Sequence, residues 1–493
     1  MADHGSPSGA GEFVLTDVRV VRPGTPEPFD ADIHVRDGVI VDVAPGLAGG
    51  ADAVVEGGGL LAMPGAVDAH MHFGIYDELS EDIAEESRAA LQGGVTTGIS
   101  YIRTGRYYLN RGGPYAEVFP EILSRSEGRS HCDYGYHVAP IEASHVEEIS
   151  DLVDDHGVTS FKIFMFYGGH GLHGRSDDQA AFLMKPEGER YDVAHFEFIM
   201  RALERARRRF PDRADAISLS LHCETAEIMA AYTAIVEARD DVHGLEAYHL
   251  SRPPHSEGLA VTTAAYLAHE TGCTNINLLH LSSAKAMDAA MRMAEAFPSV
   301  DFRREVTIGH LLADISTANG VYAKVNPPIR PREDVEALWE HVLAGNVSWV
   351  VSDHACCREE TKVDADEPDD VFLAKAGFGG TEYLLAGLFS EGLRRGLRPG
   401  DVARLVSAAP AARFGLSTKG DLAPDKDADI VLLDPDATWT IAAADSLSAQ
   451  EYTPFEGMEV TGRVERVFLR GRQVFADGDV VGEPTGRYLR RPT

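Results

Sequence analysis

The feature that most constrains the fold is an alternation of short apolar segments with amphipathic segments between residues 63 and 420. Stretches such as SEDIAEESRAALQGG and AKAMDAAMRMAEAF have helical spacing, and the apolar segments between the helical ones have the length of strands. Eight strand-then-helix units predict an α/β fold, a (β/α)8 TIM barrel, because parallel neighbouring strands need a crossover to return the chain. The expected strands are residues 60–70, 95–102, 134–141, 158–166, 216–223, 275–281, 300–308 and 348–354.

The two ends of the chain have a different residue pattern. Residues 12–62 and 421–493 alternate apolar and polar residues in short runs that Gly and Pro interrupt, which is typical of antiparallel strands and tight turns. We expect both ends to fold together as one small, composite β-sandwich domain beside a barrel of residues 63–420. Residues 1–11 lack the basic segment and apolar core of a signal peptide and are expected to form a disordered leader.

Composition excludes several classes of partner. A formal charge of −33 argues against binding to nucleic acid or to an anionic membrane surface, since both need basic protein surface. No apolar run approaches the roughly 20 residues that cross a bilayer. The 5 cysteines are an odd number without framework spacing, which favours a reducing compartment. We therefore expect a cytoplasmic protein with neither nucleic acid nor membrane as a partner.

Candidate metal ligands stand where the expected strands end. His70 and His72 are two residues apart, so on an extended strand both imidazoles face the same side, although such a pair also arises by chance. His222, His280 and Asp353 occupy the ends of three further strands. Each has an ordinary structural explanation by itself. Active sites of these barrels lie at the carboxyl ends of the strands, so the five residues together indicate a metal site.

Lys162 is unusual because it lies between Phe161, Ile163 and Phe164 in an expected strand. Desolvation lowers the pKa of a buried lysine toward the neutral amine. A neutral amine can react with carbon dioxide to form a carbamate, and this anion can bridge two cations. The alternative is a lysine in a buried ion pair.

These segments resemble the cyclic-amide branch of the amidohydrolase superfamily, which comprises hydantoinase, dihydropyrimidinase, allantoinase and dihydroorotase. PGAVDAHMHF is similar to the first metal motif of the branch, and SFKIFMFY is similar to the carboxylated-lysine strand of hydantoinases. LHCE, LLHLSSAKAM and VSDHA resemble the segments that carry two further histidines and the catalytic aspartate. The resemblance implies a hydrolase that opens a small cyclic amide of the hydantoin, dihydropyrimidine, ureide or lactam type, and that assembles as a homodimer or homotetramer.

The resemblance also implies a cofactor, namely two divalent metal ions, most often zinc, bridged by carboxylated Lys162 and a hydroxide. Asp353 would take the proton of the hydroxide as it attacks the ring carbonyl, and would then deliver this proton to the departing ring nitrogen. By position, one metal would be held by His70, His72 and Asp353, and the other by His222 and His280.

Further residues are implied to contact the substrate. Tyr167, five residues after the lysine, would stabilise the oxyanion together with the second metal, or would be a packing aromatic. Asn326, before two prolines, would contact the amide of the ring. The glycine-rich segment 168–179 follows the fourth strand and is either a cover over the site or a plain surface loop. Its candidate contacts to a polar or anionic substrate are His170, His173 and Arg175.

Two alternatives to this function remain. EVTIGHLLAD, KVNPPIRPREDVEAL and AGFGGTEYLLAGL look most like dihydroorotase, yet Gly74 stands where those enzymes have the arginine that binds the substrate carboxylate. Cys357 also replaces the last histidine of their DHAPH segment. Arg103 or Arg175 could take the place of the missing arginine only if their reach allows it. The second alternative is a non-catalytic scaffold paralogue, but such proteins typically lose metal ligands, and all six are present here.

Overall fold

The computed structural model describes residues 11–50, 53–165 and 188–493. Within these residues, eight parallel strands form one sheet in sequence order from β6 to β13. An isolated parallel bridge between Met71 and His354 joins the two edges of this sheet, so the barrel is nearly closed. The predicted α/β barrel is thereby confirmed. Its strands are β6 (Ala66–Met71), β7 (Val95–Arg103), β8 (Asp133–Ala139), β9 (Ser160–Met165), β10 (Ser218–Cys223), β11 (Asn275–Leu278), β12 (Asp301–Thr307) and β13 (Trp349–Val351).

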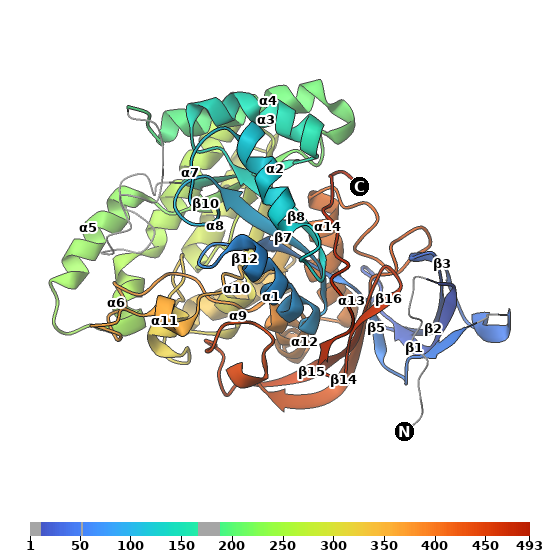
Figure 1. Cartoon of the computed structure of the whole chain (residues 1–493). Helices are drawn as coiled ribbons and strands as arrows, with labels where there is room; N and C mark the ends of the chain where they lie inside the picture. Colours follow the sequence, from blue (N-terminus) through green and yellow to red (C-terminus); the bar gives the residue numbers. More distant parts are fainter. Residues whose placement is uncertain (1–10, 51–52, 166–187) are drawn as a thin grey trace.

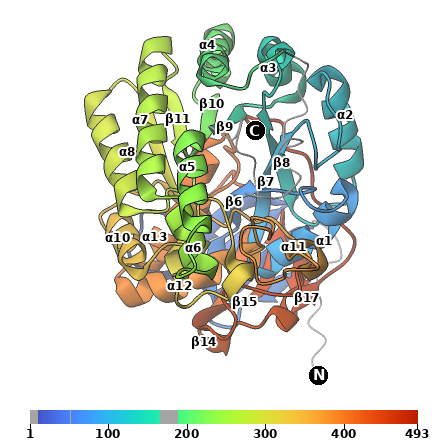
Figure 2. The same ribbon diagram turned by 90° about the vertical axis from the view of Figure 1, so that its left-hand side faces the viewer.

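Helices surround the barrel on its outside (Figure 2). Residues of β7, β8, β9 and β10 are all buried, as expected for parallel strands that are covered on both faces. The α-helices are α1 (Leu79–Gln92), α2 (Tyr115–Ser126), α3 (Ala143–His156), α4 (Val193–Arg209), α5 (Ala226–Glu237), α6 (Gly244–Ser251), α7 (Pro254–Thr271), α8 (Ala284–Ala296), α9 (Ile308–Leu312), α10 (Arg332–Leu343), α11 (Glu359–Lys362), α12 (Leu384–Arg395), α13 (Pro399–Ala403) and α14 (Ala409–Arg413).

Helix α4 shows how the sequence specifies these helices. The Asp192 carboxylate caps its start by accepting hydrogen bonds from the N–H groups of Ala194 and His195, at 3.1 and 3.3 Å. Three arginines in the last turn stand at the negative end of the helix dipole. One face of the helix is buried against the barrel.

A second sheet is built from both ends of the chain, as predicted. Strand β14 pairs antiparallel with β5, and β5 pairs with β1, so blue and red strands lie side by side in Figure 1. Nine strands make up this sheet. They are β1 (Phe13–Val20), β2 (Phe29–Arg36), β3 (Val39–Ala44), β4 (Val54–Glu56), β5 (Leu61–Pro64), β14 (Ile430–Thr440), β15 (Glu459–Leu469), β16 (Arg472–Ala476) and β17 (Asp479–Val480).

The expected strand 60–70 is wrong as one element. The structure divides it into β5, which belongs to the second sheet, and β6, which begins the barrel. The break lies at Pro64 and Gly65. Proline supplies no backbone donor, and a Cβ on Gly65 would lie 2.1 Å from the Thr96 hydroxyl oxygen, so the chain turns where only glycine fits.

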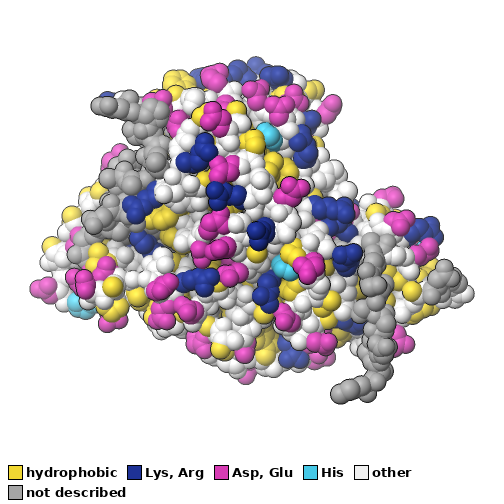
Figure 3. All heavy atoms as spheres, in the orientation of Figure 1, with side chains coloured by type: hydrophobic (Ala, Val, Ile, Leu, Met, Phe, Trp, Pro, Cys, Tyr) yellow, Lys and Arg dark blue, Asp and Glu magenta, His cyan; other side chains and the backbone are white. Residues whose placement is uncertain are grey.

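Acidic and basic side chains are interspersed on the face of the molecule shown in Figure 3, so the negative net charge is spread over the surface there. Within the described residues, no helix combines the length and the apolar composition that a membrane crossing needs.

Lys419 joins the two sheets. Its side chain is 1% exposed, and its Nζ lies 2.6 Å from a carboxylate oxygen of Asp133 on β8, 3.0 Å from Asp427 and 2.8 Å from Asp429, which precede β14. Burial by itself would lower the pKa of Lys419, but the three carboxylates raise this pKa above its ordinary value.

We predict that Lys419→Ala lowers the free energy of unfolding by about 3–5 kcal/mol, because it leaves buried carboxylates without their cation. Denaturant unfolding followed by tryptophan fluorescence measures this change. Lys285→Ala, on the exposed face of α8, is the control and should change the free energy by less than about 0.5 kcal/mol. Equal stability of the two variants would contradict the role of Lys419.

Candidate metal centre

The structure brings the six predicted ligands together at the carboxyl ends of the barrel strands. His70 is the last residue but one of β6, Lys162 and His222 lie on β9 and β10, and His280 and Asp353 follow β11 and β13. His72 comes directly after β6. All six are buried. Parallel strands put their carboxyl ends at one edge, so positions that are far apart in sequence meet in one site.

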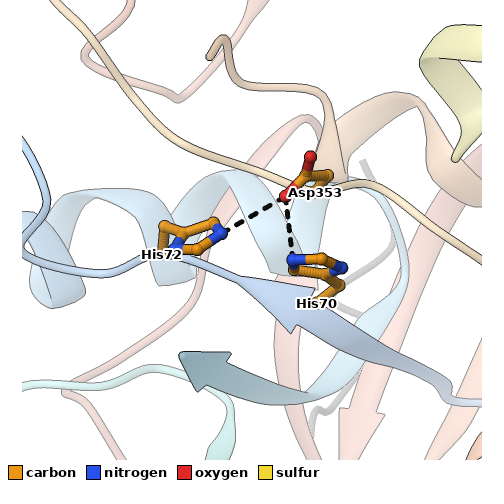
Figure 4. A group of neighbouring side chains, drawn as sticks. All are labelled: His70, His72 and Asp353. Carbon is orange, nitrogen blue, oxygen red and sulfur yellow. Dashed lines mark ion pairs between the residues drawn. The ribbon is translucent and has the colours of Figure 1, made fainter. Parts of the chain in front are cut away.

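Three of these side chains point at a common position (Figure 4). An oxygen of Asp353, Oδ1, lies 3.0 Å from Nε2 of His70 and 3.3 Å from Nε2 of His72. These ligand atoms are close enough to bind one cation. On the other side of the site, Nδ1 of His222 lies 2.9 Å from Nε2 of His280. Lys162 lies beside the first group, with Nζ 3.2 Å from Nε2 of His70.

The donor set is compatible with a bound metal. Burial is the largest cause that lowers the pKa of His70, His72, His222 and His280, so these imidazoles are neutral and their lone pairs are available to a metal. Without a metal, several buried nitrogen and oxygen atoms that face one another would lack partners, and this costs free energy. Imidazole and carboxylate are the ligands of catalytic zinc sites.

Three residues that the sequence analysis missed fix the orientation of the histidines. Nδ1 of His70 lies 2.7 Å from Glu305 Oε1, and Nδ1 of His72 lies 2.8 Å from the Tyr108 hydroxyl. Because these contacts occupy Nδ1, Nε2 of both rings faces the site. In His222 the two ring nitrogens have the opposite roles. Its Nε2 lies 2.8 Å from Oε2 of Glu224, and its Nδ1 faces His280. Glu224 is the last residue of the LHCE segment, so its place two residues after His222 could have identified it from the sequence.

Lys162 has the environment that the sequence predicted. It is 1% exposed, and its Nζ lies 3.9 Å from the ring centre of Tyr101 and 4.4 Å from that of Phe164. Burial is the main reason that its pKa falls to about 7. A substantial fraction of this amine is therefore neutral near neutral pH, which is the nucleophilic form.

Two of the candidate ligands have unusual backbone conformations. The φ angles of His280 and Asp353 are +33° and +57°, in the left-handed region that residues with a Cβ seldom adopt. Strain of this kind persists where the surrounding structure holds it and is concentrated at functional sites.

A pocket opens beside the six side chains. Its walls include Arg103, Tyr108, Phe164 and Asn326. Asn326 is 7% exposed, and its Oδ1 accepts a hydrogen bond from the Tyr248 hydroxyl, which orients the carboxamide. Tyr167, His170, His173 and Arg175 lie outside the described residues.

Gly74 is required by the backbone. Its φ is +81°, and a Cβ would lie 3.1 Å from Leu79. Its N–H donates to the Asp82 carboxylate at 2.6 Å. A side chain such as arginine at this position is therefore strained whatever the substrate.

Comparison with known proteins agrees with this architecture. Residues 199–474 match the amidohydrolase family. An allantoinase of Rubrobacter xylanophilus is 34% identical over 93% of this chain and 94% of its own length. A D-hydantoinase of Geobacillus stearothermophilus is 28% identical, with 94% and 93% of the two chains covered.

The chain belongs to the amidohydrolase family. Among solved structures, the dihydropyrimidinase of Brevibacillus agri superposes with a TM-score of 0.83 at 25% identity, over 97% of this chain and 98% of that one. Both sequence and structure therefore assign this amidohydrolase to the cyclic-amide branch, and the predicted resemblance is confirmed.

Glu305 provides a test of the metal centre. Its Oε1 accepts from His70 Nδ1 and, at 3.2 Å, from the His280 N–H, and its Oε2 accepts from Trp349 Nε1 at 2.8 Å. Glu305→Gln offers one acceptor oxygen in place of two, so at least one of these donors loses its partner. We predict a loss of metal affinity of about 10–100-fold.

The measurement is the metal retained against a series of chelator concentrations. Glu340→Gln, on the exposed face of α10, is the control and should retain metal as the wild type does. Wild-type retention by Glu305→Gln would show that Glu305 does not support the centre.

Proposed function

We propose that this amidohydrolase opens a cyclic amide of the hydantoin, dihydropyrimidine, ureide or lactam type by a hydrolysis that requires two divalent cations, with zinc as the expected metal. The single observation that carries the proposal is the convergence of buried imidazoles, Lys162 and Asp353 at the strand ends of a barrel of this family. One cation would be held by His70, His72 and Asp353, and the other by His222 and His280. When bound, the cations would supply a water activated near neutral pH and a polarising contact for the ring carbonyl.

Lys162 has a structural and electrostatic role in this proposal. Its neutral amine forms a carbamate with carbon dioxide, with loss of one proton, and the resulting anion lies between the two cation positions. The contacts of its Nζ to Tyr101 and Phe164 support this role, because they fix the side chain beside His70. A negative charge at this point offsets the repulsion between two adjacent cations.

Asp353 moves the proton. Its carboxylate takes a proton from the attacking water and then transfers it to the ring nitrogen, so that nitrogen leaves as a neutral amine. The short contacts of Oδ1 to two imidazoles hold the carboxylate in one orientation at the floor of the pocket. Tyr167 would donate to the oxygen that becomes negative, and Asn326 would bind the amide of the ring.

The substrate class follows from the relatives and from Gly74. Allantoinase and D-hydantoinase are the names of the relatives compared above, which favours ureide and hydantoin rings. Dihydroorotase is the second candidate, because the Arg103 guanidinium lies in the pocket wall and could face a carboxylate. Against it, Gly74 has no side chain at the position where dihydroorotases have their arginine, and any side chain there would be strained by the positive φ.

A panel of allantoin, hydantoins, dihydrouracil, dihydroorotate and lactams tests the proposal with zinc-loaded protein. We expect ring opening of allantoin or a hydantoin, and weak or no hydrolysis of dihydroorotate. A value of kcat/KM for dihydroorotate in the range of about 10⁴–10⁸ M⁻¹s⁻¹ would instead establish the second candidate. Absence of bound metal together with no turnover of any ring would support a scaffold protein.

Lys162→Ala is predicted to abolish activity and most metal binding, since the anion between the cations is lost. Short-chain carboxylic acids should restore part of the rate by occupying the vacated space. Metal content and turnover are measured on the same sample. A Lys162→Ala protein with two metals and near-normal turnover would contradict the bridging role.

For Asp353→Asn we predict a folded protein whose kcat is lower by about 10²–10⁴-fold or more, because an amide cannot carry the proton. Asp436→Asn, at an exposed position of β14, is the matched control and should keep the wild-type rate. The pH dependence of kcat tests whether Asp353 carries the proton. If the wild type and Asp353→Asn have the same pH profile, another group carries the proton.

A further inference from the structure

A cavity of about 180 Å³ opens at the second sheet, and arginines dominate its lining. Two tight turns and a segment near the carboxyl end of the chain form its walls. One turn joins β2 to β3 and the other joins β15 to β16, drawn in blue and in red in Figure 1. None of its lining residues lines the pocket at the strand ends. We call it the arginine cavity, after Arg470, Arg472 and Arg487 in its lining.

The two turns pack closely against each other. Gly38 in the first turn has a φ of +83°, and a Cβ there would lie 3.0 Å from the Arg470 carbonyl oxygen in the second turn. The residues Asp37 and Arg470 also have positive φ angles, +51° and +45°, as in the two-residue turns that join twisted antiparallel strands. The walls of the cavity are therefore fixed by the fold before any ligand binds.

Arg470 is a structural part of the lining. Its side chain is 15% exposed, and its guanidinium pairs with the Asp133 carboxylate and donates to the Thr485 carbonyl oxygen at 2.6 Å. Asp133 also accepts from the Arg487 N–H at 2.9 Å, so one carboxylate holds two walls together. The charge of Arg470 is thus already paired, and Arg472 and Arg487 are the cations available to a ligand.

The side chains of Arg472 and Arg487 have accessible surface and no acceptor. Arg472 is half-buried at the start of β16, and Arg487 is exposed. Within residues 11–50, 53–165 and 188–493, neither guanidinium has a hydrogen-bond or ion-pair partner. Asp37 is the one acidic residue in the described lining, and it pairs with neither of them. The lining therefore has an excess of positive charge, although the whole chain has a net charge of −33.

These donors fit a phosphate group. A guanidinium presents its N–H groups in a planar fork that matches phosphate oxygens, and such charge-assisted hydrogen bonds are stronger than neutral ones. The cavity is smaller than the roughly 300–1,000 Å³ of sites that enclose drug-sized ligands, so its size is that of a compact oxyanion. A carboxylate has fewer oxygens and less charge, and it would satisfy fewer of the donors.

We propose that the arginine cavity binds a phosphate group, as inorganic phosphate or as the head of a small phosphomonoester. The anion pairs with Arg472 and Arg487, while Arg470 keeps the walls in place. The site does not depend on the proposed hydrolysis.

The probes are inorganic phosphate and glycerol 3-phosphate, each titrated by calorimetry into the full-length, metal-loaded protein at pH 7.5. We expect saturable binding of one anion at this cavity, and the tighter of the two probes identifies the source of the phosphate group. Arg472→Gln and Arg487→Gln should each weaken binding by at least about 10-fold, because each removes a cation and its charge-assisted hydrogen bonds. The control Arg292→Gln removes the same charge from the exposed face of α8 and should leave the affinity unchanged.

The arginine variants also distinguish this site from the candidate metal centre. Phosphate bound there would be insensitive to both substitutions, because neither arginine lines that pocket. Circular dichroism checks folding, and a glutamine variant that does not fold is replaced by the lysine variant, which keeps the charge, loses the fork and should also bind more weakly. No saturable binding to the wild type, unchanged affinity of either folded variant, or equal affinity for nitrate would each overturn the proposal.

Discussion

The geometry of the candidate metal centre depends on the closure of the barrel through Asp68. This residue lies on β6 and is fully buried, and its carboxylate accepts hydrogen bonds from the Ser352 N–H at 3.1 Å, from the Ser352 hydroxyl, and from the Thr381 hydroxyl at 2.9 Å. Even with these donors, burial raises its pKa to about 6. Because Ser352 follows the last barrel strand, Asp68 ties the first strand to the last one and brings Asp353 to His70.

The turn Thr381–Tyr383, which helps to close the barrel, also lines a cavity between the barrel and the second sheet. Thr381 donates to Asp68, and the next residue, Glu382, lines the cavity. Glu382 lies 4.0 Å from His354, whose carbonyl accepts from the His72 N–H at 2.8 Å. The candidate metal centre and this cavity are therefore supported by one continuous network, although they share no lining residue.

Much of the fold and of the candidate centre could be predicted from local pattern. The eight strands follow from apolar runs separated by helical spacing, five candidate ligands follow from their places at the expected strand ends, and Lys162 was singled out by its apolar neighbours in a strand. The exception is segment 60–70, because the pattern of its apolar residues by itself predicts one continuous strand. Its division at Gly65 depends on the close approach of Thr96, and hydrophobic pattern carries no information on that contact.

The sequence by itself therefore determined the α/β barrel, the sheet from both chain ends and the positions of the candidate ligands, because strand and helix periodicity and strand-end position are local properties. Only the tertiary structure decided which ring nitrogen of each histidine faces the centre, since Glu305 is 235 residues from His70 and reaches it across the closed barrel. It also decided that Glu382 is buried beside aromatic rings, because the turn that carries Glu382 packs against strands β14, β15 and β16 of the second sheet. The physical reason is the same in each case. Such contacts form between segments that are distant in sequence, and their partners are fixed only when the barrel closes and the two ends of the chain pair.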